Sequence, residues 1–319
     1  MRLPAAGRDD KTFLGILLLK EHGMGLVSTR LRERFLAEKE RKVIPFSELV
    51  ETKKLVSTLK KTIKTPQDLK GYDPIHALYI SVQNMVSLFA EQASLLPEMK
   101  EYSRIMDKAE RVYMPDGPPI SPLTRSYFTH WAFFDATFEK DKETIGTCLL
   151  DLGELTGMDP HFLSLVGLAQ KSRMGIYEYI GCDHGLIELR EFLTDRIYPC
   201  ICPSGYPGRE GEIWFVRIHP PPFNLVNYSV NMTTPYILMG HSKQEWVDFF
   251  ERNSIGRKDS ELEVKLQSFL KHGRSTNYWN EFIVEAYAGY RKEAIFLQGI
   301  PDLANTRPHA PRKKKKHWD

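Results

Sequence analysis

A stretch of short strand patterns lies between two long segments of helical pattern. From Ser172 to Gly240, runs of β-branched and aromatic residues alternate with turns marked by glycine and proline. The stretch has room for about five short strands, and long bends separate them. Closing such a sheet on itself removes its exposed edges. The pattern therefore predicts a small antiparallel β barrel, of the SH3-like or the OB-like kind.

Helical periodicity dominates on both sides of this stretch. Residues 74–96 and 123–138 carry apolar side chains at helical spacing, and the second run contains six aromatic residues. Residues 243–252, 260–272 and 276–293 repeat the helical pattern after the barrel, and 294–297 fits a short strand or a helix end. We therefore expect an α+β protein. Its expected parts are an N-terminal extension (1–27), a helical N-terminal domain (28–171), the barrel (172–241), C-terminal helices (242–300) and a disordered basic tail (301–319).

The charge of the chain is concentrated at its C-terminal end. The 319 residues carry a formal charge of +3, and the last eight, from Arg312, hold five Lys or Arg and one Asp. The remainder is therefore close to neutral, which argues against a basic surface for nucleic acid over the whole protein. The apolar run at 13–19 is too short to span a bilayer and lacks a signal-peptide pattern. Four cysteines are too few for a secreted disulfide scaffold, so we expect a cytoplasmic protein without membrane contact.

Cysteine and histidine pairs in the β stretch suggest zinc at first sight. Cys182-x-His184 and Cys200-x-Cys202 have a one-residue spacing, whereas zinc ligand pairs normally leave two to four residues between them. Hairpin turns at Asp183-His184 and Thr194-Asp195 set Ile180 opposite Ile187, Ile187 opposite Cys202 and Leu189 opposite Cys200. These residues then share one apolar face. We therefore expect core cysteines, no metal site and no cofactor.

Aromatic and basic side chains gather in the same stretch. Barrel surfaces use such residues to stack bases or to contact peptide side chains. Interspersed glutamates weaken any phosphate-binding field, so a protein or peptide partner is favoured and RNA stays open as the alternative. The candidate binding residues are Tyr177, Tyr179, Arg190, Tyr206, Arg209 and Arg217. Trp214 shares a strand face with Val216 and Ile218, so we expect it to be buried inside the barrel.

One helical segment carries a candidate catalytic pair. Arg125 and His130 are separated by four residues in the pattern Arg-Ser-Tyr-Phe-Thr-His. This pair resembles the active-site motif of HEPN-type helical ribonucleases. The resemblance implies a metal-independent cleavage of RNA in which His130 acts as acid and base and Arg125 holds the phosphate. It also implies a homodimer through helix 123–138, because such sites form where two helical domains meet.

Two function classes follow from these features. The first is a non-enzymatic cytoplasmic binding or adaptor protein that uses the small β barrel and the aromatic helix 123–138 as contact surfaces. The second is the HEPN-like ribonuclease with Arg125 and His130. A weaker third hypothesis is a hydrolase or transferase for a small molecule, with its site between the domains.

Overall fold

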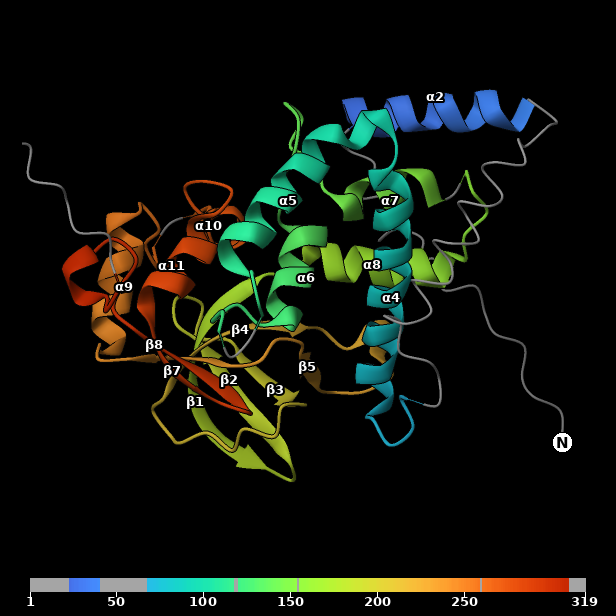
Figure 1. Cartoon of the computed structure of the whole chain (residues 1–319). Helices are drawn as coiled ribbons and strands as arrows, with labels where there is room; N and C mark the ends of the chain where they lie inside the picture. Colours follow the sequence, from blue (N-terminus) through green and yellow to red (C-terminus); the bar gives the residue numbers. More distant parts are fainter. Residues whose placement is uncertain (1–22, 41–67, 118–119, 154, 259, 310–319) are drawn as a thin grey trace, which may run out of the picture.

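A computed structural model describes residues 23–40, 68–117, 120–153, 155–258 and 260–309, and it confirms the α+β class. Helices precede and follow a small barrel (Figure 1). The helices are α2 (Leu26–Glu40), α4 (Pro74–Ser94), α5 (Lys100–Tyr113), α6 (Arg125–Phe134), α7 (Ile145–Gly153), α8 (Pro160–Lys171), α9 (Lys243–Arg252), α10 (Leu262–His272) and α11 (Tyr278–Ala286). Short 3-10 turns lie at Pro97–Met99, Pro222–Asn224 and Ala304–Thr306.

Local signals explain where several helices begin. The Asp73 side chain accepts hydrogen bonds from the backbone N–H groups of Ile75 and His76, and Pro74 occupies the first turn of α4. Asp159 and Pro160 repeat this arrangement at α8. An N-cap oxygen satisfies N–H groups that have no partner inside the helix, and proline fits where no N–H is needed. The start of α4 agrees with the helix expected from residue 74.

Five strands close into a barrel. They are β1 (Met174–Asp183), β2 (Leu186–Glu191), β3 (Ile197–Ile201), β4 (Ile213–His219) and β5 (Ser229–Asn231). Their order is β1-β2-β3-β5-β4, and a β1–β4 pairing completes the ring. The neighbours are antiparallel except for β3 and β5, which run parallel. The closed five-stranded ring confirms the small barrel that the sequence predicted, and its parallel β3–β5 pair departs from the expected antiparallel arrangement.

The sheet extends beyond the barrel through the C-terminal part of the chain. β6 (Tyr236–Met239) pairs with β4 and, in parallel, with β8 (Ala294–Gln298), and β8 pairs with β7 (Tyr287–Arg291). The prediction of one helix over 276–293 is therefore wrong, because α11 ends at Ala286 and the chain turns into the β7–β8 hairpin. The strand alternative for 294–297 is the correct one. Segment 242–300 is consequently part helix and part sheet.

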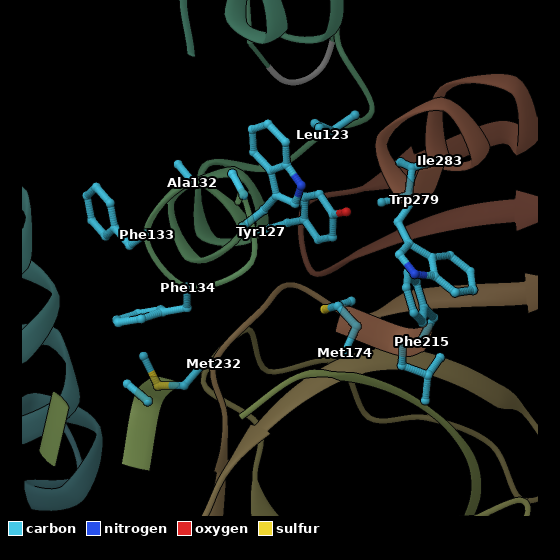
Figure 2. Close-up of a cluster of buried hydrophobic side chains, with 14 of the residues drawn as sticks. Leu123, Tyr127, Ala132, Phe133, Phe134, Met174, Phe215, Met232, Trp279 and Ile283 are labelled. Atoms are coloured by element: carbon cyan, nitrogen blue, oxygen red, sulfur yellow. The ribbon is translucent and has the colours of Figure 1, made fainter. Parts of the chain in front are cut away.

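The helices pack on the outer face of the barrel. The large core joins Ile213 and Phe215 of β4 to side chains of α6 and α11 (Figure 2). The opposite face of β4 points into the barrel, where Trp214, Val216 and Ile218 form a second core. Trp214 is 0% exposed, as the alternation predicted. One strand thus serves two cores, since its side chains alternate between two faces.

The aromatic helix 123–138 is shorter and more buried than expected. α6 covers Arg125–Phe134, and Phe138 lies beyond it in a β-bridge with Glu143. Five of its six aromatic side chains are buried and Phe128 is partly buried. These side chains fill the core between the helical layer and the barrel. They are therefore not available as the contact surface, or as the homodimer interface, that the sequence suggested.

The β2–β3 register differs from the predicted one by two residues. Ile187 lies opposite Cys200 instead of Cys202, because the β2–β3 connection is longer than the expected two-residue turn. A slip of two preserves the face, so Ile187, Leu189 and Cys200 still point into the barrel core. In β1 a bulge between Tyr179 and Gly181 changes the alternation. Tyr177 and Tyr179 therefore point inward, in place of the predicted Ile180.

Part of the predicted tail is ordered. Asp302 pairs with Arg252, and Arg307 pairs with Glu285, so residues 301–309 pack against α9 and α11. The expectation of disorder from residue 301 is wrong for this stretch, because these ion pairs fasten it despite its lack of apolar periodicity. Apolar residues at helical spacing predict a further helix at 47–64 with lysines on its other face, and this segment and the basic residues from Arg312 lie outside the described residues. Within the described ranges, no helix is both long and apolar enough to cross a bilayer.

Candidate functional site

A pocket opens where the barrel meets the β6–β8–β7 extension. Its volume is about 340 Å³, within the size range of small ligand sites. The loop between β3 and β4, strand β6 and the β7–β8 hairpin all contribute to its wall. The lining residues are Tyr206, Arg209, Gly211, Glu212, Ile213, Ile237, Leu238, Met239, His241, Arg291 and Phe296.

Glu212 organises the loop that forms one side of the pocket. Its carboxylate accepts hydrogen bonds from the Tyr206 hydroxyl at 3.1 Å, from Trp214 Nε1 at 3.3 Å and from the Arg209 backbone N–H at 3.1 Å. Burial and the neighbouring Glu212 raise the pKa of Tyr206, so its hydroxyl stays protonated and donates. The Glu212 carboxylate is therefore hydrogen-bonded within the protein.

Gly208 allows this loop to lie on the barrel. Its φ of +69° is in the left-handed region, and a Cβ atom there would lie 2.7 Å from the Tyr179 ring and 2.8 Å from the Trp214 ring. Only a residue without a side chain meets both conditions. The glycine thus sets the position of Tyr206 and Arg209 against the barrel.

Two arginines give the pocket its charge. Arg209 and Arg291 are both exposed, and among the described residues neither takes part in an ion pair. The Arg291 guanidinium lies over the Phe296 ring, 5.5 Å from its centre, which holds it by a cation–π contact. A site with two such arginines, and with its own carboxylate already hydrogen-bonded, suits an anionic group of a ligand.

The other four predicted binding residues do not line this pocket. Tyr177 and Tyr179 are buried in the barrel core, and Tyr179 stacks on Trp214. Arg190 lies half-buried near Glu178 on the outside of the β1–β2 hairpin. Arg217 is 1% exposed and belongs to a buried network. Of the six predicted binding residues, Tyr206 and Arg209 line the pocket.

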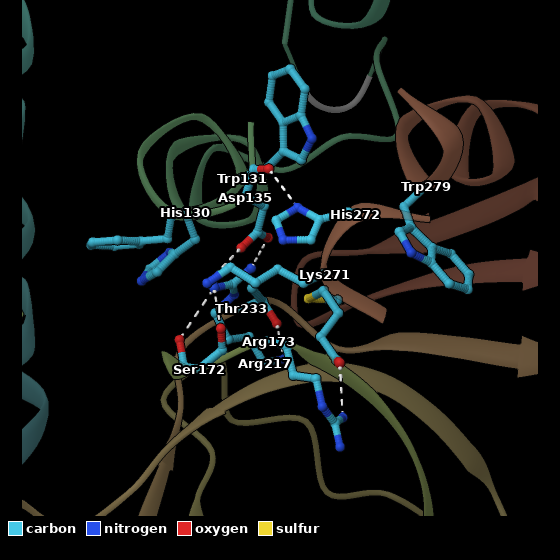
Figure 3. Close-up of polar contacts among 12 residues, drawn as sticks. His130, Trp131, Asp135, Ser172, Arg173, Arg217, Thr233, Lys271, His272 and Trp279 are labelled. Carbon is cyan, nitrogen blue, oxygen red and sulfur yellow. Dashed lines mark hydrogen bonds and ion pairs between the residues drawn. The ribbon is translucent and has the colours of Figure 1, made fainter. Parts of the chain in front are cut away.

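The buried network joins α6, β4 and α10 beneath the helical layer (Figure 3). Arg217 of β4 pairs with Asp135 at the end of α6, and Lys271 of α10 lies 3.8 Å from the same carboxylate. Arg217 also donates to the backbone carbonyl and hydroxyl of Ser172 at 3.2 Å. Each of these groups links segments that are far apart in the sequence.

Two histidines lie next to this ion network. The rings of His130 and His219 are 5.1 Å apart, and His219 Nε2 is 3.1 Å from the Ser172 hydroxyl. Burial, with Arg217 nearby, lowers the pKa of His130 to about 3, and burial with His130 lowers that of His219 far below its ordinary value. Burial also lowers the pKa of Lys271 to about 8.

A serine near a histidine invites a catalytic interpretation, but the surroundings argue for a structural role. Ser172, Arg217 and His219 are all at least nine-tenths buried, and so is Asp135. The Ser172 hydroxyl lies 2.6 Å from the Ala169 carbonyl, to which it donates. A nucleophile needs room for a substrate beside it, and these groups pack against protein on every side. The network therefore fastens the helices to the barrel.

The two residues of the predicted catalytic pair lie on different sides of α6. Arg125 is exposed, whereas His130 is 1% exposed, and its Nδ1 lies 2.7 Å from the Ser126 carbonyl within the same helix. The two side chains therefore do not meet in one cleft of this chain.

The predicted core role of the cysteines agrees with their surroundings in part. Cys200 is buried, and Cys202 is half-buried next to Ser204 and Asn231. Cys182 lies opposite Ile187 and therefore on the same face of the sheet, but it is exposed because it is near the tip of the β1–β2 hairpin.

Comparison with known proteins adds no assignment: no family profile, curated protein or solved structure matches the chain. Sequence reasoning missed Arg291, Phe296 and His241 as pocket residues. Arg291 and Phe296 fell in segments expected to be helical or undecided. A signal was present in Tyr290-Arg291-Lys292-Glu293-Ala294, where polar residues separate two short runs that contain aromatic residues.

Proposed function

We propose that the protein is a non-enzymatic binding or adaptor protein and that the pocket between the barrel and the β7–β8 hairpin is its contact site. The partner is a protein or peptide segment that brings an anionic group to Arg209 and Arg291. The observation that supports this most is the pair of exposed arginines around a pocket whose own carboxylate is already hydrogen-bonded.

Features around the pocket fit a peptide better than a nucleic acid. Single-stranded nucleic acids bind to exposed aromatic rings, whereas Tyr177, Tyr179 and Tyr206 are buried here. Exposed Met239 and half-buried Phe296 supply apolar contact next to the arginines. An apolar wall with a few placed charges is typical of sites that bind a side chain.

The proposal is tested on an array of random peptides with three proteins. These are wild type, the double variant Arg209→Ala/Arg291→Ala, and a control, Arg104→Ala/Arg111→Ala, which removes two exposed arginines from α5. We expect wild type and control to select the same peptides and the pocket variant to lose them. Equal binding by the pocket variant, or no selection by wild type, contradicts the proposal.

The ribonuclease alternative gains no support from the positions of Arg125 and His130. It has its own test, incubation of wild type and His130→Ala with mixed RNA in EDTA. A binding protein cleaves nothing in either form. Cleavage by wild type alone would favour the enzyme, since a general acid–base histidine contributes typically 10²–10⁴ in rate.

A further inference from the structure

Strand β7 forms an open edge of the sheet. It is the last strand in the order and pairs with β8 alone among the described strands. Most of β7 is solvent-accessible, and Tyr290 is 51% exposed. Natural sheets usually cover such an edge or make it unattractive to other chains, because it can pair with an added strand.

The register of the hairpin shows which backbone groups face outward. Arg291 and Ala294 are paired across the two-residue turn Lys292-Glu293, so they exchange both backbone hydrogen bonds. The next pair, Tyr290 with Ile295, then does not. The backbone N–H and C=O of Tyr290 therefore point away from β8, toward the open edge.

The open edge and the pocket share one face of the sheet. Gly289 lies opposite Phe296 and Arg291 lies opposite Ala294, so these four residues are on the same side. Phe296 and Arg291 line the pocket. Gly289 has no side chain, which leaves room beside Arg291 for a side chain from a neighbouring strand.

We infer that the partner is an extended peptide segment that adds to β7 as a further strand and directs an acidic side chain toward Arg291 and Arg209. This inference rests on the proposed function and specifies its ligand. Backbone hydrogen bonds to Tyr290 supply affinity that does not depend on sequence, and the arginines select the acid. A side chain on the added strand would lie within the reach of diagonal neighbours, roughly 7–8 Å, from Arg291.

Charge favours an acidic peptide over a second copy of this edge. The sequence of β7, Tyr-Ala-Gly-Tyr-Arg, contains no acidic residue, and Lys292 follows it. Two copies joined at β7 would each add an arginine, and neither strand would supply a carboxylate. A peptide with glutamate or aspartate at alternate positions supplies the opposite charge.

The test uses a labelled peptide of alternating Glu and Val and measures its binding by fluorescence anisotropy. The comparison peptides replace Glu by Lys or carry N-methyl groups on successive backbone nitrogens, which prevents strand pairing on both edges. The protein variants are Tyr290→Pro, which removes the outward N–H, and Tyr290→Phe, which keeps the backbone. We expect the Glu–Val peptide to bind wild type and Tyr290→Phe alike. Binding should weaken about tenfold or more with Tyr290→Pro, with the N-methylated peptide and with the lysine peptide.

Each other outcome overturns the inference in a distinct way. Equal binding of the N-methylated peptide excludes strand addition even if Tyr290→Pro fails to fold. If that peptide still depends on Arg209 and Arg291, the pocket proposal stands. Equal binding of the lysine peptide excludes the acidic ligand. No binding of the Glu–Val peptide, or dimerisation of wild type that Tyr290→Pro abolishes, shows that β7 has a different occupant.

Discussion

At the residue scale, Asp135 is the carboxylate that holds the buried ion network together. Its carboxylate is the shared partner of Arg217 and Lys271, and all three side chains are buried. Removing one member of such a network leaves the other charges buried without compensation, which costs more than the network itself contributes to stability.

We therefore expect Asp135→Ala to lower the free energy of unfolding by about 3–5 kcal/mol in urea denaturation. The control is Glu263→Ala, which breaks the exposed pair with Arg196 and should cost less than about 1 kcal/mol. Adding Arg217→Met to Asp135→Ala should restore part of the loss. Equal free energies of unfolding for Asp135→Ala and Glu263→Ala would show that the buried ion pair stabilises the protein no more than the exposed one does.

His130 should make the protein sensitive to acid. Its pKa is about 3 when folded and about 6.5 when exposed, so below pH 6.5 the unfolded chain binds the proton that the folded chain rejects. Stability present at neutral pH is therefore lost as the pH falls, by about 2 kcal/mol between pH 7 and pH 5. His219 acts with the same sign. Urea denaturation should show that the free energy of unfolding changes less between pH 7 and pH 5 in His130→Gln than in wild type. The same change in both proteins would refute this cause.

At the element scale, the start of α2 depends on a distant carboxylate. Glu143 accepts hydrogen bonds from the backbone N–H groups of Val27 at 2.8 Å and Ser28 at 2.9 Å. Gly25 lies so close to Glu143 that an added Cβ would come within 2.2 Å of its side chain. Glu143 is 115 or more residues away in sequence, so it serves as a tertiary cap for a helix that has no acidic residue in its first turn.

Glu143→Gln should release α2 without unfolding the rest of the protein. The substitution keeps the shape and removes the charge, and we expect a loss of about 1–3 kcal/mol. Hydrogen exchange should increase in residues 26–37 and stay unchanged in α8 and β4. Asp141→Asn is the matched control, because Asp141 caps the same helix end from an exposed position. A uniform increase in exchange over the whole chain would argue against a local role.

At the scale of the whole molecule, the barrel and the helices share one hydrophobic core. That core includes Ile213 and Phe215 of the barrel, Phe134 of α6 and Trp279 of α11. Strand β8 also contributes Ala294 to the inner core of the barrel. An isolated fragment of residues 172–241 would lose β8 and expose the outer face of β4 to water.

We therefore expect the full chain to unfold in one transition and the fragment 172–241 to remain unfolded. Burial of apolar area is the main favourable contribution to folding, and the fragment retains the inner core alone. Circular dichroism and a proton–nitrogen NMR spectrum provide the measurement. A well-dispersed spectrum from the fragment would identify the barrel as an independent domain.

The sequence by itself determined the class of fold and the alternation that buries Trp214, because hydrophobic period and turn residues act over a few positions. Two of the candidate binding residues that it indicated, Tyr206 and Arg209, line the pocket. Only the tertiary structure decided that Arg217 lies beneath the helices. Alternation put this residue outside the barrel, but no local pattern shows that Asp135 and Lys271 meet it there. The same holds for the β7–β8 hairpin, which brings Arg291 to the pocket: its pairing with β6 joins segments about 60 residues apart. Strand pairing and burial between distant segments determined the candidate site, and no short sequence pattern indicates either of them.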